Sequence, residues 1–463
     1  MQWSNKQISI VAIVAFTSFM GTFLISSVNI ALPAIEKSFE LNAVTLSWVI
    51  TSFLLATAMF LLPVGRLGDL TGIRRIFKIG VIIFFVASLA CGLAGSGFWL
   101  ILFRYVQGVG ASFTSTTGPA ILVSAFLPQH RGRVLGISVS AVYLGLAFGP
   151  FAGGLLTQYL GWRSIFFTAS SLGIITAIIA FLYLGKDETS GKLSSLRISY
   201  WGTLFYMIGL VALVYGSSNI PSTGAWLIMG GGLASLVVFW LVESKALSPV
   251  FETRLFTQNR LFAFSNIAAL INYSATFAIV FLMSLYLQKV QGFSPRDAGF
   301  VLIAQPVMMA LFSPVAGRLS DRVQPRYLTS LGMLMCTMGL ASFIFLTPNT
   351  PLWLIVLLLV LVGLGFGLFS SPNMNTIMSS VNKKYYGTAS GTAASMRVLG
   401  QIASMTIATL FFAAIIGKQA IEAVPEGLFM QAMRWGFVCF TLICMAGIYF
   451  SFKRGSIKRE ASS

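Results

Sequence analysis

Long stretches without a charged residue alternate with short charged connectors along nearly the whole chain. Residues 8–32, 79–97 and 352–369 are three of these stretches. Each is roughly 18 to 25 residues long, the length that a helix needs to cross a bilayer core of about 30 Å. Because the pattern recurs from one end of the chain to the other, it predicts an all-α membrane protein rather than the buried helices of a large soluble one.

The charged connectors divide the chain into fourteen predicted membrane helices. These are 8–32, 44–64, 76–95, 98–124, 134–157, 164–184, 201–217, 224–242, 261–287, 297–316, 327–347, 352–374, 390–416 and 430–452. Two longer connectors bracket the seventh and eighth helices, so we expect three parts. They are an N-terminal six-helix bundle (1–184), two linker transmembrane helices with flanking cytoplasmic loops (185–260), and a C-terminal six-helix bundle with a short cytoplasmic tail (261–463).

Composition agrees with a membrane location and narrows the function. Mean hydropathy is +0.87 and 57% of the residues are hydrophobic, more apolar surface than a soluble fold can hide. The net charge of +18 could indicate nucleic-acid binding, but the basic residues lie in short connectors, so we expect no nucleic-acid partner. The four cysteines lie in apolar stretches without metal-ligand spacing, and the one histidine lies in a connector. We therefore expect no metal, no cofactor and no enzyme activity.

The distribution of Lys and Arg predicts the orientation. With the N-terminus inside, 22 of the 30 basic residues lie at inner helix ends, including Lys453 and Arg454 of the tail, and five lie in outer loops. Cytoplasmic loops of membrane proteins carry this excess. We expect a multi-pass protein of the inner (plasma) membrane with both termini in the cytoplasm, and a monomer.

A charged sequence after the second predicted helix recurs after the tenth. Residues 65–74 read GRLGDLTGIR and residues 317–326 read GRLSDRVQPR, 252 positions later. Further glycines match at a spacing of 255: Gly108, Gly110, Gly132, Gly136 and Gly145 correspond to Gly363, Gly365, Gly387, Gly391 and Gly400. The order of the matches indicates an internal duplication. Two repeated bundles with a site between them are typical of secondary transporters that work by alternating access.

Four motifs together resemble the major facilitator superfamily, and most closely its fourteen-span branch of drug–proton antiporters. They are the loop GRLGDLTGIRR at 65–75, RYVQGVGA at 104–111, GLAFGPFAGG at 145–154 and SSVNIALPAI at 26–35. The resemblance covers essentially the whole chain. It implies the major facilitator fold, two six-helix bundles plus two extra central helices, and an exporter of the multidrug-efflux kind.

The resemblance assigns roles to the first three motifs. The loop and its repeat are expected to form a conformational latch: Gly65, Arg66, Asp69, Gly72, Arg74, Gly317, Asp321 and Arg322. Arg104, beside Gln107, is linked in the family to proton transfer, and a guanidinium inside an apolar helix needs acceptors. The antiporter motif comprises Gly145, Gly149, Pro150, Gly153 and Gly154, whose small residues permit close helix contact. We expect its partner to be the eleventh helix.

Polar residues within the predicted helices are the candidates for a substrate cavity. They are Asn29, Tyr143, Asn272, Tyr273, Gln305, Asn373, Arg397 and Gln401. None of the twelve acidic residues lies in the middle of a predicted helix, and Leu24 stands where the fourteen-span exporters carry an Asp. Without an opposing acid, Arg104 and Arg397 favour neutral or anionic amphiphiles over cations.

Proton coupling is left with few candidates, namely Arg104 and Gln107 with the rim acids Glu36 and Asp297. The favoured function is export of small amphipathic molecules by alternating access, coupled to proton entry. The alternative is an exporter of anionic or lipid-like metabolites, or a uniporter or importer, without conventional proton coupling. The expected partners are the small amphipathic substrate, protons and the lipid bilayer.

Overall fold

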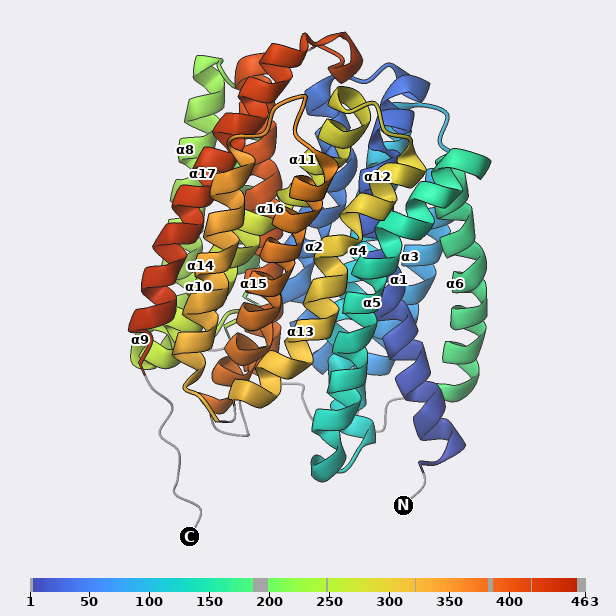
Figure 1. Ribbon diagram of the computed structural model, residues 1–463. Helices are drawn as coiled ribbons and strands as arrows, with labels where there is room; N and C mark the ends of the chain where they lie inside the picture. The colour runs from blue at the N-terminus through green and yellow to red at the C-terminus, as the bar shows by residue number, and fades with distance from the viewer. Residues whose placement is uncertain are drawn as a thin grey trace.

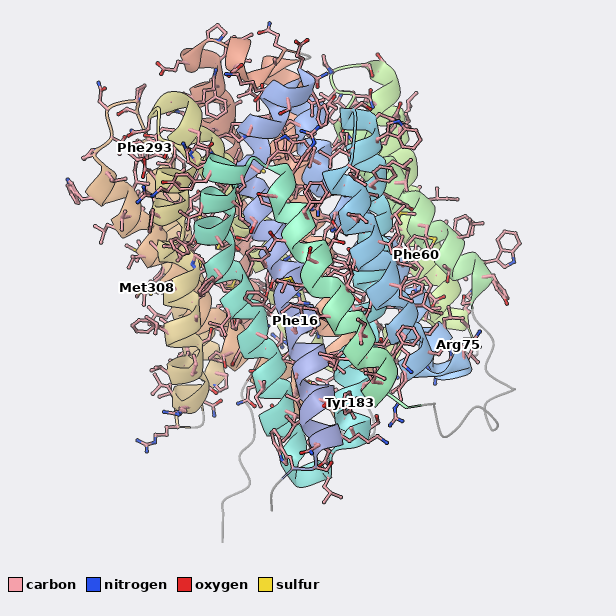
Figure 2. All side chains as sticks on the ribbon, turned by 90° about the vertical axis from the view of Figure 1, so that its right-hand side faces the viewer. Phe16, Phe60, Arg75, Tyr183, Phe293 and Met308 are labelled. Carbon is pink, nitrogen blue, oxygen red and sulfur yellow. The ribbon has the colours of Figure 1, made fainter. Side chains whose placement is uncertain are left out.

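The structure is a computed structural model in which residues 3–185, 199–246, 249–320, 322–381, 386–417 and 419–455 are described. All regular elements in these ranges are helices that run roughly side by side (Figure 1). The first and last described residues lie at the same end of the molecule. We call this end the terminal face and the opposite end the far face. Arg75 and Tyr183 lie toward the terminal face and Phe293 toward the far face (Figure 2).

The first group of helices consists of α1 (Asn5–Phe39), α2 (Ala43–Thr71), α3 (Ile73–Gly92), α4 (Gly97–Ala125), α5 (Pro128–Leu160) and α6 (Arg163–Tyr183). Two further helices follow, α7 (Tyr200–Ser217) and α8 (Thr223–Lys245), and a short one, α9 (Thr253–Gln258). The second group consists of α10 (Arg260–Thr276), α11 (Ala278–Leu285), α12 (Pro295–Leu302), α13 (Ala304–Ser320), α14 (Pro325–Phe343), α15 (Leu352–Ser379), α16 (Tyr386–Phe411) and α17 (Glu426–Lys453). Short π and 3₁₀ turns, η1 (Tyr286–Val290), η3 (Phe412–Ile416) and η4 (Ile421–Ala423), complete the described helices.

Local sequence explains where several helices begin and end. Ser4 and Gln7 form a reciprocal capping box at the start of α1, and the Asn42 side chain accepts the Thr45 N–H at the start of α2. Gly72 separates α2 from α3 with a φ of +103°, a backbone conformation that residues with a Cβ rarely adopt. The charged motif at 65–75, expected as a loop, is therefore helical on both sides of a sharp break at Gly72.

Twelve helical segments of the described chain are long and apolar enough to cross a membrane. Their outward side chains are largely apolar, with Leu182 72% and Leu227 73% exposed, as suits contact with lipid. This confirms an all-helical, multi-pass membrane fold. The predicted fourth and eleventh spans correspond to α4 and α14, helices of 29 and 19 residues that do not count among these twelve.

Two predicted helices are interrupted. The ninth, expected as one helix over 261–287, is divided between α10 and α11, and the tenth, over 297–316, between α12 and α13. At the first break the backbone N–H of Ala278 is bonded to the Ser404 hydroxyl of α16 at 3.0 Å instead of to its own helix. A neighbouring side chain thus satisfies a backbone group that lipid could not.

The same packing scheme occurs in both groups. In the first group α1 packs on α5, α2 on α4, α3 on α4 and α3 on α6. In the second group α10 packs on α16, α13 on α15, α14 on α15 and α14 on α17. Between the groups, α5 packs on α12 and α13, and α16 packs on α2. The α7–α8 pair packs through α7 against α2 and α16, one helix from each group.

Glycines at matched positions make equivalent backbone contacts. A Cβ on Gly108 would meet the carbonyl oxygen of Phe53, and one on Gly363 would meet that of Gln305, 252 residues after Phe53. Helices α2 and α4 therefore touch backbone to backbone in the same way as α13 and α15. The repeat inferred from sequence spacing is present as repeated helix contacts.

Gly110 and Gly365 provide a matched pair for testing this arrangement. A Cβ on Gly110 would lie 2.5 Å from the backbone nitrogen of Phe84, and a Cβ on Gly365 would lie 2.8 Å from that of Cys336. We expect Gly110→Ala and Gly365→Ala each to lower the apparent melting temperature of the purified protein by several degrees, because overpacking costs about 1–3 kcal/mol. Gly136→Ala, which meets nothing within 4 Å, is the control. Equal stability of all three variants would contradict the equivalence.

Candidate functional site

Hydrogen bonds join the two helix groups toward the far face. The Ser284 hydroxyl of α11 donates to the backbone oxygen of Asn29 at 2.8 Å, and the Gln288 amide donates to that of Ile30 at 3.0 Å. The Thr409 hydroxyl of α16 donates to Ser47 of α2 at 2.8 Å. These bonds hold the two groups together toward the far face, and we call them the far-face closure.

Glu36 belongs to this closure. Its side chain, 4% exposed at the end of α1, accepts the backbone N–H of Glu422 at 3.0 Å through Oε1. Glu422 lies in η4, and its backbone oxygen accepts from the Lys289 ammonium at 3.1 Å. The backbone N–H of Ala43 also donates to the oxygen of Gln419 in the same loop, at 3.0 Å. A buried carboxylate of the first group thus holds the α16–α17 loop of the second.

The glycine motif of α5 packs mainly against α1. Cβ atoms on Gly145, Gly149 and Gly153 would meet the backbone or side chains of α1. Gly154 instead faces the second group, where a Cβ would lie 2.6 Å from the carbonyl oxygen of Pro295 in α12. The prediction that this motif packs against the eleventh helix is wrong. Glycines spaced by four residues lie on one face of α5, and α1 occupies that face.

Four polar side chains from four helices lie close together midway between the faces. The Tyr143 hydroxyl of α5 is hydrogen-bonded to the Ser370 hydroxyl of α15, which joins the two groups. The Tyr273 hydroxyl of α10 lies within electrostatic range of the Tyr143 hydroxyl and of the Arg397 guanidinium of α16. The Tyr273 ring packs edge-on against Phe366 at a centroid distance of 5.2 Å. We call Tyr143, Tyr273, Ser370 and Arg397 the central cluster.

The central cluster contains three of the predicted cavity residues, and it offers hydroxyls, aromatic faces and one positive charge. No acidic residue takes part in it among the described side chains. Such a set can hold a planar or aromatic molecule by stacking, and an anion or a carbonyl oxygen by donated hydrogen bonds.

The other predicted cavity residues lie elsewhere. The Asn29 amide donates to its own helix at Ile25, 3.0 Å away, next to the far-face bonds. Asn272 lies beside the Cys336 thiol of α14, inside the second group. Gln305 is buried in α13 where α15 crosses, and no hydrogen-bond partner for its Oε1 is found among the described residues. Gln401 is half-buried one helical turn after Arg397.

Asn373 binds Arg454, which the sequence analysis placed in the cytoplasmic tail. Arg454 is 2% exposed, and its guanidinium donates to the Asn373 side-chain oxygen at 2.8 Å and to the Ser451 backbone oxygen at 2.7 Å. Its other donors reach Ser265, Thr329 and the Ser451 hydroxyl. Arg454 therefore ties α10, α14, α15 and α17 together near the terminal face. Sequence alone could not indicate this buried role, because an arginine that follows an apolar stretch is usually a charge at the membrane surface.

Arg104 is fully buried, as its place in an apolar helix suggested. Its Nε donates to the Val49 backbone oxygen at 3.0 Å, and Nη1 donates to Gln107, which in turn donates to the Ser88 hydroxyl at 2.6 Å. Its guanidinium lies 4.5 Å from the centre of the Phe53 ring. Nη2 is buried, and the described residues supply no hydrogen-bond partner for it. Neutral acceptors and a ring, rather than an acid, thus hold this charge.

The predicted latch residues lie at the terminal ends of α2 and α13. A Cβ on Gly65 would lie 3.2 Å from Thr116 of α4, and one on Gly317 would lie 2.7 Å from the Ser371 hydroxyl of α15, the matching contact of the repeat. Arg66 is half-buried and Arg322 is exposed, while the Arg74 guanidinium faces Gly185 beyond α6. The side chain of Asp69 and the whole of Asp321 lie outside the described residues, so the latch remains a prediction.

Asp297 has a local role in the structure. Its carboxylate accepts the Ser294 hydroxyl at 2.7 Å, while its backbone N–H donates to the same hydroxyl at 3.1 Å. This pairing caps the N-terminus of α12.

Comparisons with known proteins agree on one family. The model described as Major Facilitator Superfamily matches residues 11–405. The riboflavin transporter RibZ of Clostridioides difficile is 31% identical, over 88% of this chain and 88% of that protein. The multidrug resistance protein Stp of Mycobacterium tuberculosis is 31% identical, over 86% and 75%. The methylenomycin A resistance protein of Bacillus subtilis is 28% identical, over 87% of each.

Solved structures share the fold. An inward-facing, unoccupied bacterial homologue of the human lysosomal transporter Spinster superposes with a TM-score of 0.70 at 16% identity, covering 98% of each chain. A D-xylose–proton symporter superposes with a TM-score of 0.67 at 13% identity, covering 97% of this chain and 99% of that one.

The bond between Tyr143 and Ser370 can be measured by a double-mutant cycle. We expect Tyr143→Phe and Ser370→Ala each to lower the free energy of unfolding by about 1 kcal/mol, and the double variant to be no less stable than either single one, because both remove the same bond. Tyr183→Phe, at an exposed position on α6, is the control. Additive losses in thermal unfolding would mean that the two hydroxyls stabilise the protein independently.

Proposed function

This chain belongs to the Major Facilitator Superfamily and is a multi-pass membrane transporter, not an enzyme; we propose that it exports small amphipathic molecules by alternating access. The relatives include a protein named as a riboflavin transporter and others named as drug resistance proteins, which supports export of mid-sized organic molecules. The resemblance of its antiporter motif to exporters gives the direction.

We further propose the fourteen-span topology, with the terminal face in the cytoplasm. Helices α4 and α14 are then the fourth and eleventh spans. Arg104 and several hydroxyl residues are buried within the bundle and make α4 less apolar than the twelve segments counted above, although it crosses the bilayer. The excess of Lys and Arg at the terminal ends of the helices supports this orientation. Residues 1–184 and 261–463 then form the two bundles that move relative to each other, with 185–260 as their linker.

The observation that carries the proposal is the central cluster between the two groups, beneath a closed far face. A substrate bound at Tyr143, Tyr273, Ser370 and Arg397 touches both bundles, so it can bias their relative position. Because Arg397 has no opposing acid there, neutral or anionic substrates are favoured. At an effective dielectric of about 20, two charges 4 Å apart interact by about 4 kcal/mol.

Coupling to protons is proposed to act through the far-face closure. Glu36 accepts a hydrogen bond across the interface, and a charged acceptor bonds more strongly than a neutral one. Protonation of Glu36 from the outside would weaken the closure and favour opening toward the far face. Arg104 with Gln107 remains the second coupling candidate, since the Arg104 charge is fully buried and lies, like Glu36, toward the far-face end of its helix.

The alternative is transport of anionic or lipid-like metabolites, or facilitated uptake, without proton coupling. The positive charges of Arg104 and Arg397 and the lack of a mid-membrane acid in the sequence support this alternative. It would become the favoured function if Glu36 were shown not to couple protons.

Transport by purified protein in liposomes tests the proposal. We expect uptake of riboflavin and of an anionic amphiphile into inside-out proteoliposomes, and little uptake of a lipophilic cation such as ethidium. Arg397→Gln should reduce transport of the anion about tenfold more than transport of riboflavin, because the cationic donor is lost. Arg163→Gln, at the first residue of α6 and outside the cluster, is the control. A preference for the cation would overturn the electrostatic argument.

A second measurement isolates the proton. We expect Glu36→Gln to remove most of the stimulation of transport by an imposed pH gradient, while transport without a gradient continues. Glu40→Gln, an exposed acid one turn further along the chain, should leave the stimulation intact. Full stimulation in Glu36→Gln would exclude Glu36 as the coupling group.

A further inference from the structure

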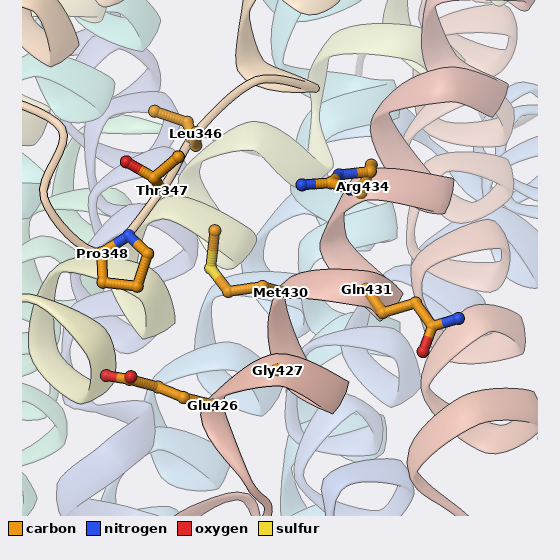
Figure 3. Close-up of a pocket in the computed structure, with 8 residues that line it drawn as sticks. All are labelled: Leu346, Thr347, Pro348, Glu426, Gly427, Met430, Gln431 and Arg434. Carbon is orange, nitrogen blue, oxygen red and sulfur yellow. The ribbon is translucent and has the colours of Figure 1, made fainter.

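A pocket lies on the surface of the second group at the far face, apart from the central cluster. It has a volume of about 400 Å³ and lies between the α14–α15 loop and the first turns of α17 (Figure 3). Leu346 and Pro348 form its side on the loop, and Glu426, Met430 and Arg434 form its side on α17. Ligand sites commonly have volumes in this range.

The two charged residues of the pocket lie on one face of α17. Glu426, Met430 and Arg434 are spaced by four residues, so they follow one another along the helix, with the two charges about 12 Å apart along its axis. Both charged side chains are exposed, and neither forms an ion pair with a described residue. The pocket therefore offers a cationic and an anionic group, separated by the apolar Met430.

Exposed aromatic residues place the pocket at the level of the membrane surface. Phe345 is 78% exposed, Trp353 67% and Trp435 51%, and all three lie within a few residues of the pocket lining. Tryptophan side chains, such as those of Trp353 and Trp435, gather at the headgroup level of membrane proteins.

A second hollow adjoins the pocket on its apolar side. It has a volume of about 250 Å³, shares Leu346 with the pocket, and is lined also by Phe345, Leu354 and Leu358. This hollow runs along α14 and α15 toward the middle of the molecule, because Leu354 and Leu358 are successive turns of α15. A charged pocket next to an apolar hollow matches a headgroup joined to an acyl chain.

We propose that this pocket binds a phospholipid with a primary ammonium headgroup, such as phosphatidylethanolamine. The phosphate bonds to the Arg434 guanidinium, the ammonium bonds to the Glu426 carboxylate, and an acyl chain lies against Leu354 and Leu358. A primary ammonium donates hydrogen bonds to a carboxylate, whereas the trimethylammonium of phosphatidylcholine does not. Free phosphoethanolamine carries the same charges, but it has no chain to fill the hollow.

Native mass spectrometry of the delipidated full chain tests the proposal. The protein is mixed with equal amounts of phosphatidylethanolamine, phosphatidylcholine and phosphatidylglycerol that carry identical acyl chains. We expect phosphatidylethanolamine to be retained about tenfold more than the other two, the factor that one charge-assisted hydrogen bond provides. Equal retention of the three lipids by the unmodified chain would overturn the proposal.

Variants separate the two contacts. Arg434→Gln should lower retention of all three lipids, and Glu426→Gln should abolish the preference for phosphatidylethanolamine over phosphatidylglycerol. Lys37→Gln, which removes an exposed far-face charge on α1, should change neither result. A preference that survives Glu426→Gln would contradict the assignment of the ammonium. Displacement of the lipid by an equal concentration of free phosphoethanolamine would contradict the role of the apolar hollow.

Discussion

Direct contact between helix backbones is the constraint on which the rest of this structure depends. Gly108 lets α4 touch the α2 backbone at Phe53, and Gly363 lets α15 touch the α13 backbone at Gln305. Lipid tails are as apolar as the side chains that face them, so moving these side chains from lipid into a helix interface releases little free energy. Membrane helices therefore associate through close packing and polar contacts. Glycines therefore fix which helices are neighbours, and the neighbours fix where the polar side chains meet.

The packing is duplicated, but the chemistry is not. At the spacing of 255 that relates Gly108 to Gly363, Arg104 corresponds to Leu359 and Arg397 corresponds to Val142. Each of these two arginines, Arg104 fully buried and Arg397 half-buried, is thus present in one half only. The repeat supplies two similar bundles, which alternating access would require, and the asymmetric charges would give the proposed site its preference for neutral or anionic substrates.

Much of the architecture could be predicted from sequence because its signals are local. The uncharged stretches located the helices, and matched glycines located the repeat before any contact was known. The antiporter motif marked a close contact but not its partner, since a glycine stripe shows that a helix approaches without showing which one. Arg454 and its bond to Asn373 could not be predicted, because five donors reach acceptors on four helices that are distant in the chain.

The candidate site divides in the same way. Tyr143, Tyr273 and Arg397 could be nominated as polar residues in apolar helices, whereas Asn272 and Asn373 met the same criterion and lie inside the second group. Helical position alone does not distinguish an interior face from an interface face when both are apolar. Ser370 acquires its importance only from the position of Tyr143 on the opposite bundle.

The position of Glu36 determines how a proton could act on the proposed transport cycle. A carboxylate in the middle of the membrane would respond to both sides in turn, but Glu36 lies at the far end of α1, bonded to the loop that completes the closure. A proton arriving there would change the strength of the closure without entering the proposed substrate site. Substrate and proton would then be coupled through the relative position of the bundles, and the positive charge at Arg397 could remain constant throughout the cycle. This separation is consistent with a central cluster that keeps its cation and contains no described acid.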